Sequence, residues 1–358
     1  DVTLGQIATR ARVSGRDIFA LIAYVGRDVA GAAQFLPADH ADGPGYLTPL
    51  TADELASRVE DLRRHAATHT PPSYDNGRWS LPGAQAKLAV RYQDNAWYLS
   101  EGDEPSTHII KPAVPGYDNF DINETAILNT AAEIGLPAAT TTIVELADNT
   151  HALVSQRYDR ARLPDGTWTR VHQEDLCQAL GVKPGRKYET DGGPGTVRIA
   201  GLLKQLAPTS YESRARFFNA LVYSWAIGAT DGHAKNYSLL LDGPASHLAP
   251  LYDVNSALPY TKPWGHRFRG IKKLHSAQRI GTKTAFARIT QTDWYTVAKQ
   301  LALPATIVDD TIDQTLTNVT NILPRVYTDL ADTIDLDPGK RVNWSSVLSE
   351  YHKHLNTT

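Results

Sequence analysis

The sequence predicts an α+β fold in two parts, a β-rich part that ends near residue 160 and a mostly helical part after it. Between residues 76 and 160, short runs of β-branched and aromatic residues are bounded by Asp, Asn, Gly and Pro, a pattern typical of strands joined by turns. Beyond residue 172, apolar residues recur at helical intervals over longer stretches. One pair of strand-like runs interrupts this helical part.

The composition is that of an ordinary folded protein. The chain has 358 residues, enough for two domains or one two-lobed domain, and 42% of its residues are hydrophobic and 21% charged. The formal net charge of -3 provides no electrostatic reason to expect non-specific binding to nucleic acid or to membranes.

The sequence also carries an expectation about the cell compartment. Cys177 is the single cysteine, so no disulfide can form within the chain, which fits a reducing environment. No apolar run is long enough to span a membrane, and the N-terminus lacks the basic and apolar regions of a signal peptide. We therefore expect a cytoplasmic protein.

The first elements are expected to be helical. Apolar residues fall at helix-like intervals over residues 1–35, and residues 38–46, ADHADGPGY, have the composition of a loop. Residues 51–66, TADELASRVEDLRRHA, have an amphipathic pattern that begins with a capping box formed by Thr51 and Glu54. This pattern predicts a helix.

Strands are expected next. Residues 86–100, AKLAVRYQDNAWYLS, predict a hairpin that turns at 93–95. Residues 107–112, THIIKP, predict a strand stopped by Pro112, and residues 123–136, NETAILNTAAEIGL, predict a helix that ends at Gly135. TTTIVEL at 140–146 and HALVSQRYDR at 151–160 predict a further strand pair.

The helical part is expected to hold helices at 173–180, 196–206 and 211–228, and several more from residue 286 onward. Two strands are expected within it, YSLLL at 237–241 and LAPLYDV at 248–254, joined by a turn at 242–244.

The strongest chemical signal lies around the first of these two strands. Asp231 is followed five positions later by Asn236, and Asp253 comes after the strand pair. In kinases an Asp accepts the proton of the attacking hydroxyl, an Asn five residues later holds a metal, and a later Asp holds metal against the phosphates. Taken singly, Asp231-Gly232 is a turn and Asp253 an ordinary acid at the end of a strand. The residues upstream therefore decide between these interpretations.

The upstream residues supply the other parts of a kinase in the expected order. Residues 80–87, SLPGAQAK, contain a turn of small residues that would let backbone amides approach phosphates, although alone a plain hairpin is the simpler interpretation. Lys111 ends a strand and Glu124 lies in the next helix, where a kinase pairs such residues. Alone they would be a solvated lysine and an acid that complements a helix dipole. The joint order predicts a bilobal protein-kinase-like fold with a β-rich N-lobe and a mostly helical C-lobe.

Several segments also resemble one family. SLPGAQAK, THIIKP, LVSQRYDR, VHQEDLCQALG, DGGPG, and WAIGATDGHAKNYSLLL followed by YDVNSALPY look like the HipA family of bacterial serine/threonine kinases, toxins of toxin–antitoxin modules. The resemblance runs from about residue 10 to at least 260. It implies part of the family's N-terminal subdomain with a connecting helix at 1–75, a nucleotide-binding N-lobe at 76–160, and a C-lobe with the catalytic loop at 161–358.

The resemblance implies a role for each matching residue. Asp231 would be the catalytic base, and Asn236 and Asp253 the magnesium ligands. Lys235 would neutralise the transferring phosphoryl group, and His233 would support the loop. ATP would be held by a phosphate loop at 82–87, by Lys111 and its partner Glu124, and by a hinge that flanks the adenine. This nucleotide-binding set is Ser80, Gly83, Ala84, Gln85, Lys87, Lys111, Glu124, Gln156 and Tyr158.

The resemblance further implies regulation and partners. Ser80 matches a loop serine that the family autophosphorylates, which ejects the loop and switches the kinase off. The substrate would be a protein of translation, with glutamyl-tRNA synthetase as the best-known target, and the outcome growth arrest and persistence. A helix-turn-helix antitoxin of the HipB type would bind the kinase and carry most of the DNA contact.

Two other functions compete with this one. A small-molecule or lipid phosphotransferase would use the same fold and ATP site, since neither specifies the acceptor. A pseudokinase that serves as a corepressor scaffold is the second alternative, and the presence of Asp231, Asn236, Asp253 and Lys111 argues against it.

A separate polar cluster suggests metal binding. His172, Glu174, Asp175 and Cys177 lie close together in the sequence, but the spacing of a zinc site and a second cysteine are absent. We therefore expect a structural helix here, with Cys177 as a small buried apolar side chain.

Overall fold

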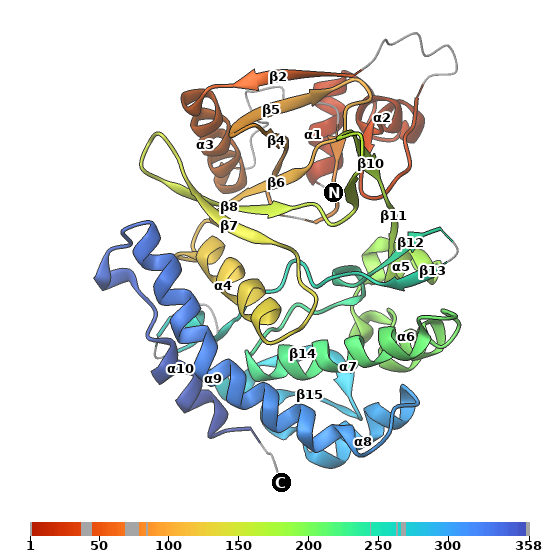
Figure 1. Ribbon diagram of the computed structural model, residues 1–358, viewed down its shortest axis with the longest axis vertical. Helices are drawn as coiled ribbons and strands as arrows, with labels where there is room; N and C mark the ends of the chain where they lie inside the picture. The colour runs from red at the N-terminus through yellow and green to blue at the C-terminus, as the bar shows by residue number, and fades with distance from the viewer. Residues whose placement is uncertain are drawn as a thin grey trace. The chain divides into compact units, whose positions relative to one another are not determined.

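A computed structural model describes residues 2–36, 45–68, 79–83, 85–243, 245–262, 264–265 and 270–355. The chain forms two compact units, the first from residues 1–121 and 140–173, the second from residues 122–139 and 174–358. Figure 1 labels the elements of both.

A six-stranded antiparallel sheet forms the centre of the first unit (Figure 1), in the order β2-β5-β4-β6-β8-β7. Its alternating strands present one apolar face, which packs on helix α3, Ala52–Thr68. The predicted capping box begins this helix, since Thr51 N donates to Glu54 at 2.8 Å and Glu54 N to Thr51 Oγ1 at 3.2 Å. The strands are β2 Tyr46–Leu50, β4 Leu88–Gln93, β5 Ala96–Glu101, β6 His108–Pro112, β7 Thr141–Glu145 and β8 His151–Gln156.

The first unit contains further elements besides this sheet and α3. The expected helical region at 1–35 contains two helices and then a two-residue strand, β1, which pairs in parallel with β3. Beyond the sheet, β9 and β10 form a short antiparallel ladder. The elements are α1 Val2–Ala11, α2 Ile18–Val25, β1 Asp28–Val29, β3 Trp79–Ser80, β9 Arg160–Arg162 and β10 Trp168–Arg170.

Helices dominate the second unit, as predicted. Helix α9 contacts α7, α8 and α10, and two short hairpins, β12–β13 and β14–β15, lie among the helices. The helices are α4 Phe120–Glu133, α5 Leu176–Ala179, α6 Thr196–Leu203, α7 Ser210–Ala226, α8 Gln291–Gln300, α9 Ile307–Thr333 and α10 Trp344–His352. The strands are β12 Ser238–Asp242, β13 Ala245–Leu248, β14 His275–Ile280 and β15 Lys283–Ala285, while β11, His172–Asp175, begins in the first unit and ends in the second.

An aromatic core fixes the C-terminal end of α7. The rings of Trp225 and Trp294 meet edge to face with centroids 5.6 Å apart, and Tyr351 donates a hydrogen bond to Trp225 O at 2.8 Å. Gly228 then ends the helix with a φ of 66°, and a Cβ at this position would lie 2.8 Å from the side chain of Leu258. The chain that leaves α7 therefore starts from a rigid point.

Three predictions about elements are wrong in detail. The partner of β12 is Ala245–Leu248 rather than 248–254, because Pro250 has no amide to pair and Asp253 adopts a positive φ of 57°. Asp253 is therefore not a strand residue. The expected helix at 173–180 begins only at Leu176, since residues 172–175 form β11.

The two units also divide the chain differently from the predicted segments 1–75, 76–160 and 161–358. Residues 161–173 stay with the first unit, to which Arg170 contributes an ion pair with Asp28. Most of α4 belongs to the second unit, where Asn123 donates to Ser256 O at 2.8 Å. Among the described helices, none is long and apolar enough to cross a membrane.

Candidate active site

The loop that follows α7 carries the predicted catalytic residues of the second unit. His233 N donates to Asp231 O at 2.8 Å, and Asn236 N donates to His233 O at 2.9 Å. The Asn236 side chain closes the loop by donating from Nδ2 to Asp231 O at 2.8 Å. These bonds fix the backbone, while the Asp231 side chain is 52% exposed and so accessible to a substrate.

Asp253 lies next to this loop. Asn236 Nδ2 is 3.5 Å from Asp253 O, and both residues line one small pocket. Asp253 has a positive φ, a conformation that Asp tolerates better than most residues, and such backbone strain is frequent at functional sites. The pocket is lined by Ser224, Ala229, Asp231, Gly232, Asn236, Tyr237, Asp253, Val254 and Asn255. The structure thus brings Asp231, Asn236 and Asp253 together at one pocket.

The donor set at this pocket fits a magnesium ion. Both hydrogen bonds that the Asn236 side-chain amide makes to described residues use Nδ2. The side-chain oxygen Oδ1 is therefore left to act as a ligand. Asp253 adds carboxylate oxygen, and Mg²⁺ prefers such oxygen ligands together with water and phosphate. Among the described residues, no three or more His, Cys, Asp or Glu side chains form a group that could hold a metal ion.

His233, for which we predicted a supporting role, is buried beside the loop. Its ring is only 4% exposed and packs edge-on against Tyr188 with centroids 5.0 Å apart. Burial lowers the pKa of His233, and Nε2 lies 3.8 Å from Asp231 Oδ1. The lowered pKa favours the neutral imidazole, whose ring packs against Tyr188.

Lys235 has a different partner from the one that the resemblance implied. Its Nζ lies 2.6 Å from Asp175 Oδ2, and the other carboxylate oxygen of Asp175 caps α5 by accepting from Cys177 N and Gln178 N, each at 2.9 Å. This ion pair favours a structural role for Lys235, as a link between the catalytic loop and α5.

The same contacts explain the polar cluster at 172–177. Asp175 is a helix cap, and burial raises the pKa of the Cys177 thiol, which is 1% exposed. Asp175 and Cys177 therefore have structural roles in α5.

The predicted phosphate-loop residues lie in the first unit. Ser80 ends β3, and Lys87 donates to Pro82 O at 2.8 Å and to Gly83 O at 3.3 Å. Gly83 has a φ of 108°, and a Cβ there would lie 2.8 Å from Lys87 Nζ. Gln85 donates to Pro112 O at 3.2 Å. Lys87 and Gln85 therefore hold the two sides of the loop, while Ala84 lies outside the described residues.

Lys111 and Glu124 are both buried, at 8% and 1% exposure. Lys111 lies within the paired part of β6, opposite Leu153 of β8, and Glu124 lies in the second turn of α4. Lys111 is therefore not a solvated lysine at a strand end, and Glu124 is not an acid in the first turn of the helix, which were the simpler interpretations of each residue alone. Because they belong to different units, their pairing stays a prediction.

The predicted hinge follows β8. Gln156 ends the strand with an exposed side chain. Tyr158 donates to Gln173 Oε1 at 2.5 Å, and Gln173 Nε2 donates to Asp159 Oδ2 at 3.1 Å. Gln173 of β11 therefore orients the Tyr158 side chain through these hydrogen bonds.

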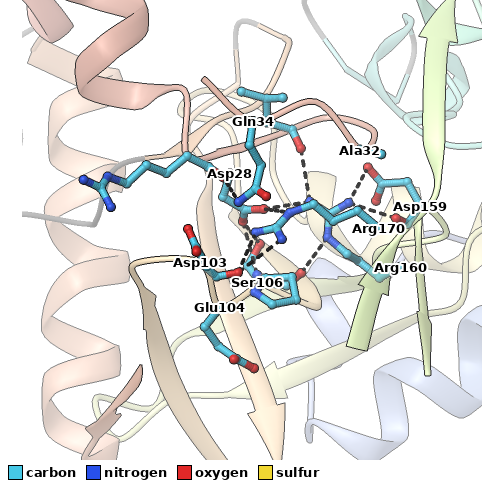
Figure 2. Close-up of polar contacts among 12 residues, drawn as sticks. Asp28, Ala32, Gln34, Asp103, Glu104, Ser106, Asp159, Arg160 and Arg170 are labelled. Carbon is cyan, nitrogen blue, oxygen red and sulfur yellow. Dashed lines mark hydrogen bonds and ion pairs between the residues drawn. The ribbon is translucent and has the colours of Figure 1, made fainter. Parts of the chain in front are cut away.

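A buried ion cluster anchors the hinge, and sequence reasoning missed it. Arg157 forms a two-point contact with Asp159 at 3.0 and 2.9 Å, and Arg160 Nη2 lies 2.7 Å from Asp28 Oδ1. Figure 2 shows Asp28 together with Ser106 and Arg160, and Ser106 Oγ donates to Asp28 Oδ2 at 2.5 Å. Its only sequence signal was the charged run within LVSQRYDR, since the partner Asp28 lies more than a hundred residues upstream.

The cluster also reaches the strand that holds Ser80. Asp28 belongs to β1, which pairs with β3 so that Val29 lies opposite Ser80. Arg157 and Arg160 further donate to Val29 O at 2.8 and 3.1 Å. Through β1, the hinge cluster positions the strand from which the predicted phosphate loop begins.

At this pocket lie Asp231 as the predicted base, Asn236 five residues on, and Asp253 later in the chain. This order is the one expected of a phosphotransferase of the protein-kinase class. The family described as HipA-like C-terminal domain matches residues 79–323, more than half of the chain. The chain belongs to the HipA family of serine/threonine-protein kinases.

Individual relatives agree with this membership. A putative kinase, Y4mE, of Sinorhizobium fredii is 32% identical over 89% of this chain and 74% of its own length. The serine/threonine-protein kinase toxin HipA of Shewanella oneidensis is 31% identical over 69% of this chain and 58% of its own length.

The fold agrees as well. The Shewanella oneidensis HipA structure, solved with HipB and operator DNA, matches 98% of this chain and 80% of its own with a TM-score of 0.77 and 24% identity. The α+β kinase-like fold predicted from the sequence is thereby confirmed.

Proposed function

We propose that this protein is an ATP- and Mg²⁺-dependent kinase of the HipA toxin type, which transfers the γ-phosphoryl group to a serine or threonine of a protein. The observation that carries the proposal is the pocket shared by Asp231, Asn236 and Asp253. In the order of the chain, these are the base and metal-binding groups of protein kinases.

The chemistry assigned to the pocket balances as a single displacement. The acceptor hydroxyl gives its proton to the Asp231 carboxylate, its oxygen forms a bond to the γ-phosphorus, and the bond to the oxygen bridging the β- and γ-phosphorus breaks to release ADP. Asn236 and Asp253 would hold Mg²⁺, which neutralises charge on the phosphates. Lys111, Gln156, Tyr158 and the loop at 82–87 would bind ATP.

Regulation and partners follow the family. We propose that Ser80 is autophosphorylated, since it lies at the entry to the loop and a phosphate adds nearly two negative charges there. A HipB-type antitoxin is the proposed partner, supported by the relative solved with HipB and its operator DNA. A protein of translation, such as an aminoacyl-tRNA synthetase, is the proposed cytoplasmic substrate, and growth arrest with persistence the proposed outcome.

The variant Asp231→Asn tests the central assignment. Removal of the base should lower phosphate transfer by at least about a hundredfold while ATP binding, measured by calorimetry, stays within about twofold. Asp242→Asn, an exposed carboxylate at the end of β12, is the matched control and should keep the rate.

A comparison of the wild-type protein with the Asp231→Asn variant identifies the substrate. Phosphoproteomics of cells that express the wild-type chain or the Asp231→Asn variant should reveal protein sites phosphorylated only by the wild type. Transfer at the native rate by Asp231→Asn would overturn the assignment of the base. Labelling of a small molecule or lipid without any protein would favour the metabolic alternative.

A further inference from the structure

The motif DGGPG at 191–195 has no part in the chemistry proposed above, yet the structure connects it to the candidate base. The residue three positions before it, Tyr188, donates a hydrogen bond from its phenol to Asp231 Oδ1 at 2.6 Å. The same ring packs edge-on against His233 of the catalytic loop. The Tyr188 phenol thus contacts two residues of the loop at once.

The glycines of the motif shape the turn that holds Tyr188. Gly192 has a φ of 80°, and Gly193 N donates to Tyr188 O at 2.9 Å. A Cβ on Gly193 would lie 2.2 Å from Arg186 O and 2.6 Å from Tyr188 O, closer than atoms can approach. A Cβ on Gly195 would lie 2.3 Å from the Glu189 carboxyl group. At Gly193, where the clash is with backbone atoms, the turn closes this tightly only with glycine.

Three further contacts attach this turn to the rest of the second unit. Glu189 accepts a hydrogen bond from Arg279 N of β14 at 2.6 Å, and Thr196 donates to Arg279 O at 2.9 Å. On the other side, Ala234 N of the catalytic loop donates to Lys187 O at 3.3 Å. Tyr188 is therefore held between β14 and the catalytic loop.

The hydrogen bond from Tyr188 restrains the Asp231 carboxylate, which has few other contacts that fix it. The Asp231 side chain is half exposed, and its Oδ2 accepts no hydrogen bond from any residue in the described ranges. A donated bond to a carboxylate is stronger than one between neutral groups and restricts rotation of the side chain. Burial and the bond to Asp231 both raise the pKa of Tyr188, so the phenol keeps its proton and stays a donor.

We propose that Tyr188 is a positioning residue for the base: it holds Asp231 Oδ1 and leaves Oδ2 to receive the proton of the acceptor hydroxyl. The DGGPG turn is the device that keeps Tyr188 in place. This inference rests on the proposed function, since it assigns a partner to the base of that reaction. A base held in one orientation reacts faster because less freedom is lost on reaching the transition state.

Tyr188→Phe tests the proposal, because it removes one oxygen and keeps the ring that packs on His233. We expect kcat for phosphate transfer to fall at least about tenfold, while KM for ATP, ATP binding and the melting temperature stay near the wild-type values. Tyr211→Phe is the matched control: this exposed tyrosine at the start of α7 lies outside the pocket and should keep the wild-type kcat.

A second pair of variants acts on the turn. Gly192→Ala strains a residue with positive φ that has open space around it, so the chain still folds, and we expect a smaller fall in kcat. Gly181→Ala is matched to it, with a φ of 63° and open space but no place in the motif, and should leave kcat unchanged.

The outcomes separate this inference from the function on which it rests. If Asp231→Asn abolishes transfer and Tyr188→Phe keeps the full rate, only the positioning role is overturned. A rise in kcat for Tyr188→Phe would also overturn it, since the phenol would then occupy the place of the acceptor hydroxyl. If Asp231→Asn itself keeps the native rate, the proposed function fails first.

Discussion

Single residues show how local sequence and distant packing share the candidate site. The spacing of Asp231 and Asn236 is local, and one side-chain hydrogen bond across this spacing closes the loop. The partners of Tyr188 and Lys235 are not local: Asp231 lies 43 positions from Tyr188, and Asp175 lies 60 positions from Lys235. The sequence therefore identifies the loop but not what surrounds it.

Lys235→Ala distinguishes a structural lysine from one that contacts phosphate. Because Lys235 pairs with Asp175, which is 6% exposed, we expect a loss of about 1–3 kcal/mol in the free energy of unfolding, measured by urea denaturation. Transfer per folded molecule should fall only a few-fold.

The Asp175→Asn variant is the matched control, since an asparagine keeps the helix cap and removes the charge. The two stability losses should be less than additive when the variants are combined. A hundredfold loss of transfer in Lys235→Ala, with Asp175→Asn fully active, would restore the phosphoryl contact that the resemblance implied.

At the scale of elements, turns and periodicity predicted most of the first unit. The hairpin of β4 and β5 turns at Asp94 and Asn95, both with positive φ, as the local sequence indicated. The β1–β3 pair was not predictable, since each strand has two residues and their pairing depends on the ion cluster around Asp28.

The ion cluster should make the first unit sensitive to acid. Burial raises the pKa of Asp159, but the charges of Arg157 and Arg160 and the hydrogen bonds outweigh it and hold the value at about 2. A lowered carboxylate pKa stabilises the fold above the unfolded value of about 4, and this stabilisation, about 2 kcal/mol, is lost as pH falls toward 2.

Asp159→Asn should therefore lower the free energy of unfolding at pH 7 and flatten its decline between about pH 4 and 2, measured by urea denaturation across this range. Asp53→Asn, an exposed residue of α3, should keep the wild-type slope. An unchanged acid slope in Asp159→Asn would show that the cluster does not carry this dependence.

At the scale of the whole molecule, the assigned roles are divided between the two units. The groups assigned to ATP lie mainly in the first unit and those assigned to transfer in the second. Autophosphorylation of Ser80 would therefore need both units, and its measurement tests whether the two units act together.

Ser80→Ala should remove the phosphate that wild-type protein acquires on incubation with ATP, measured by intact-mass spectrometry. Its activity should also persist during that incubation, whereas the wild type should lose activity as the added charge repels the nucleotide. Ser345→Ala, an exposed serine of α10, should behave as the wild type. Phosphate that accumulates at another residue of the Ser80→Ala variant would exclude this switch.

Local sequence patterns were enough to predict the α+β class, most strands and helices, and the order of Asp231, Asn236 and Asp253, because turn chemistry, periodicity and motif spacing are local properties of the chain. The folded structure was needed to show that these three residues share a pocket, that Lys235 pairs with Asp175, and that Tyr188 contacts Asp231. Such contacts join residues far apart in the chain. These contacts depend on which opposite charges pair in the interior and on where glycine allows two backbone segments to approach closely. Motif spacing along the chain does not specify either.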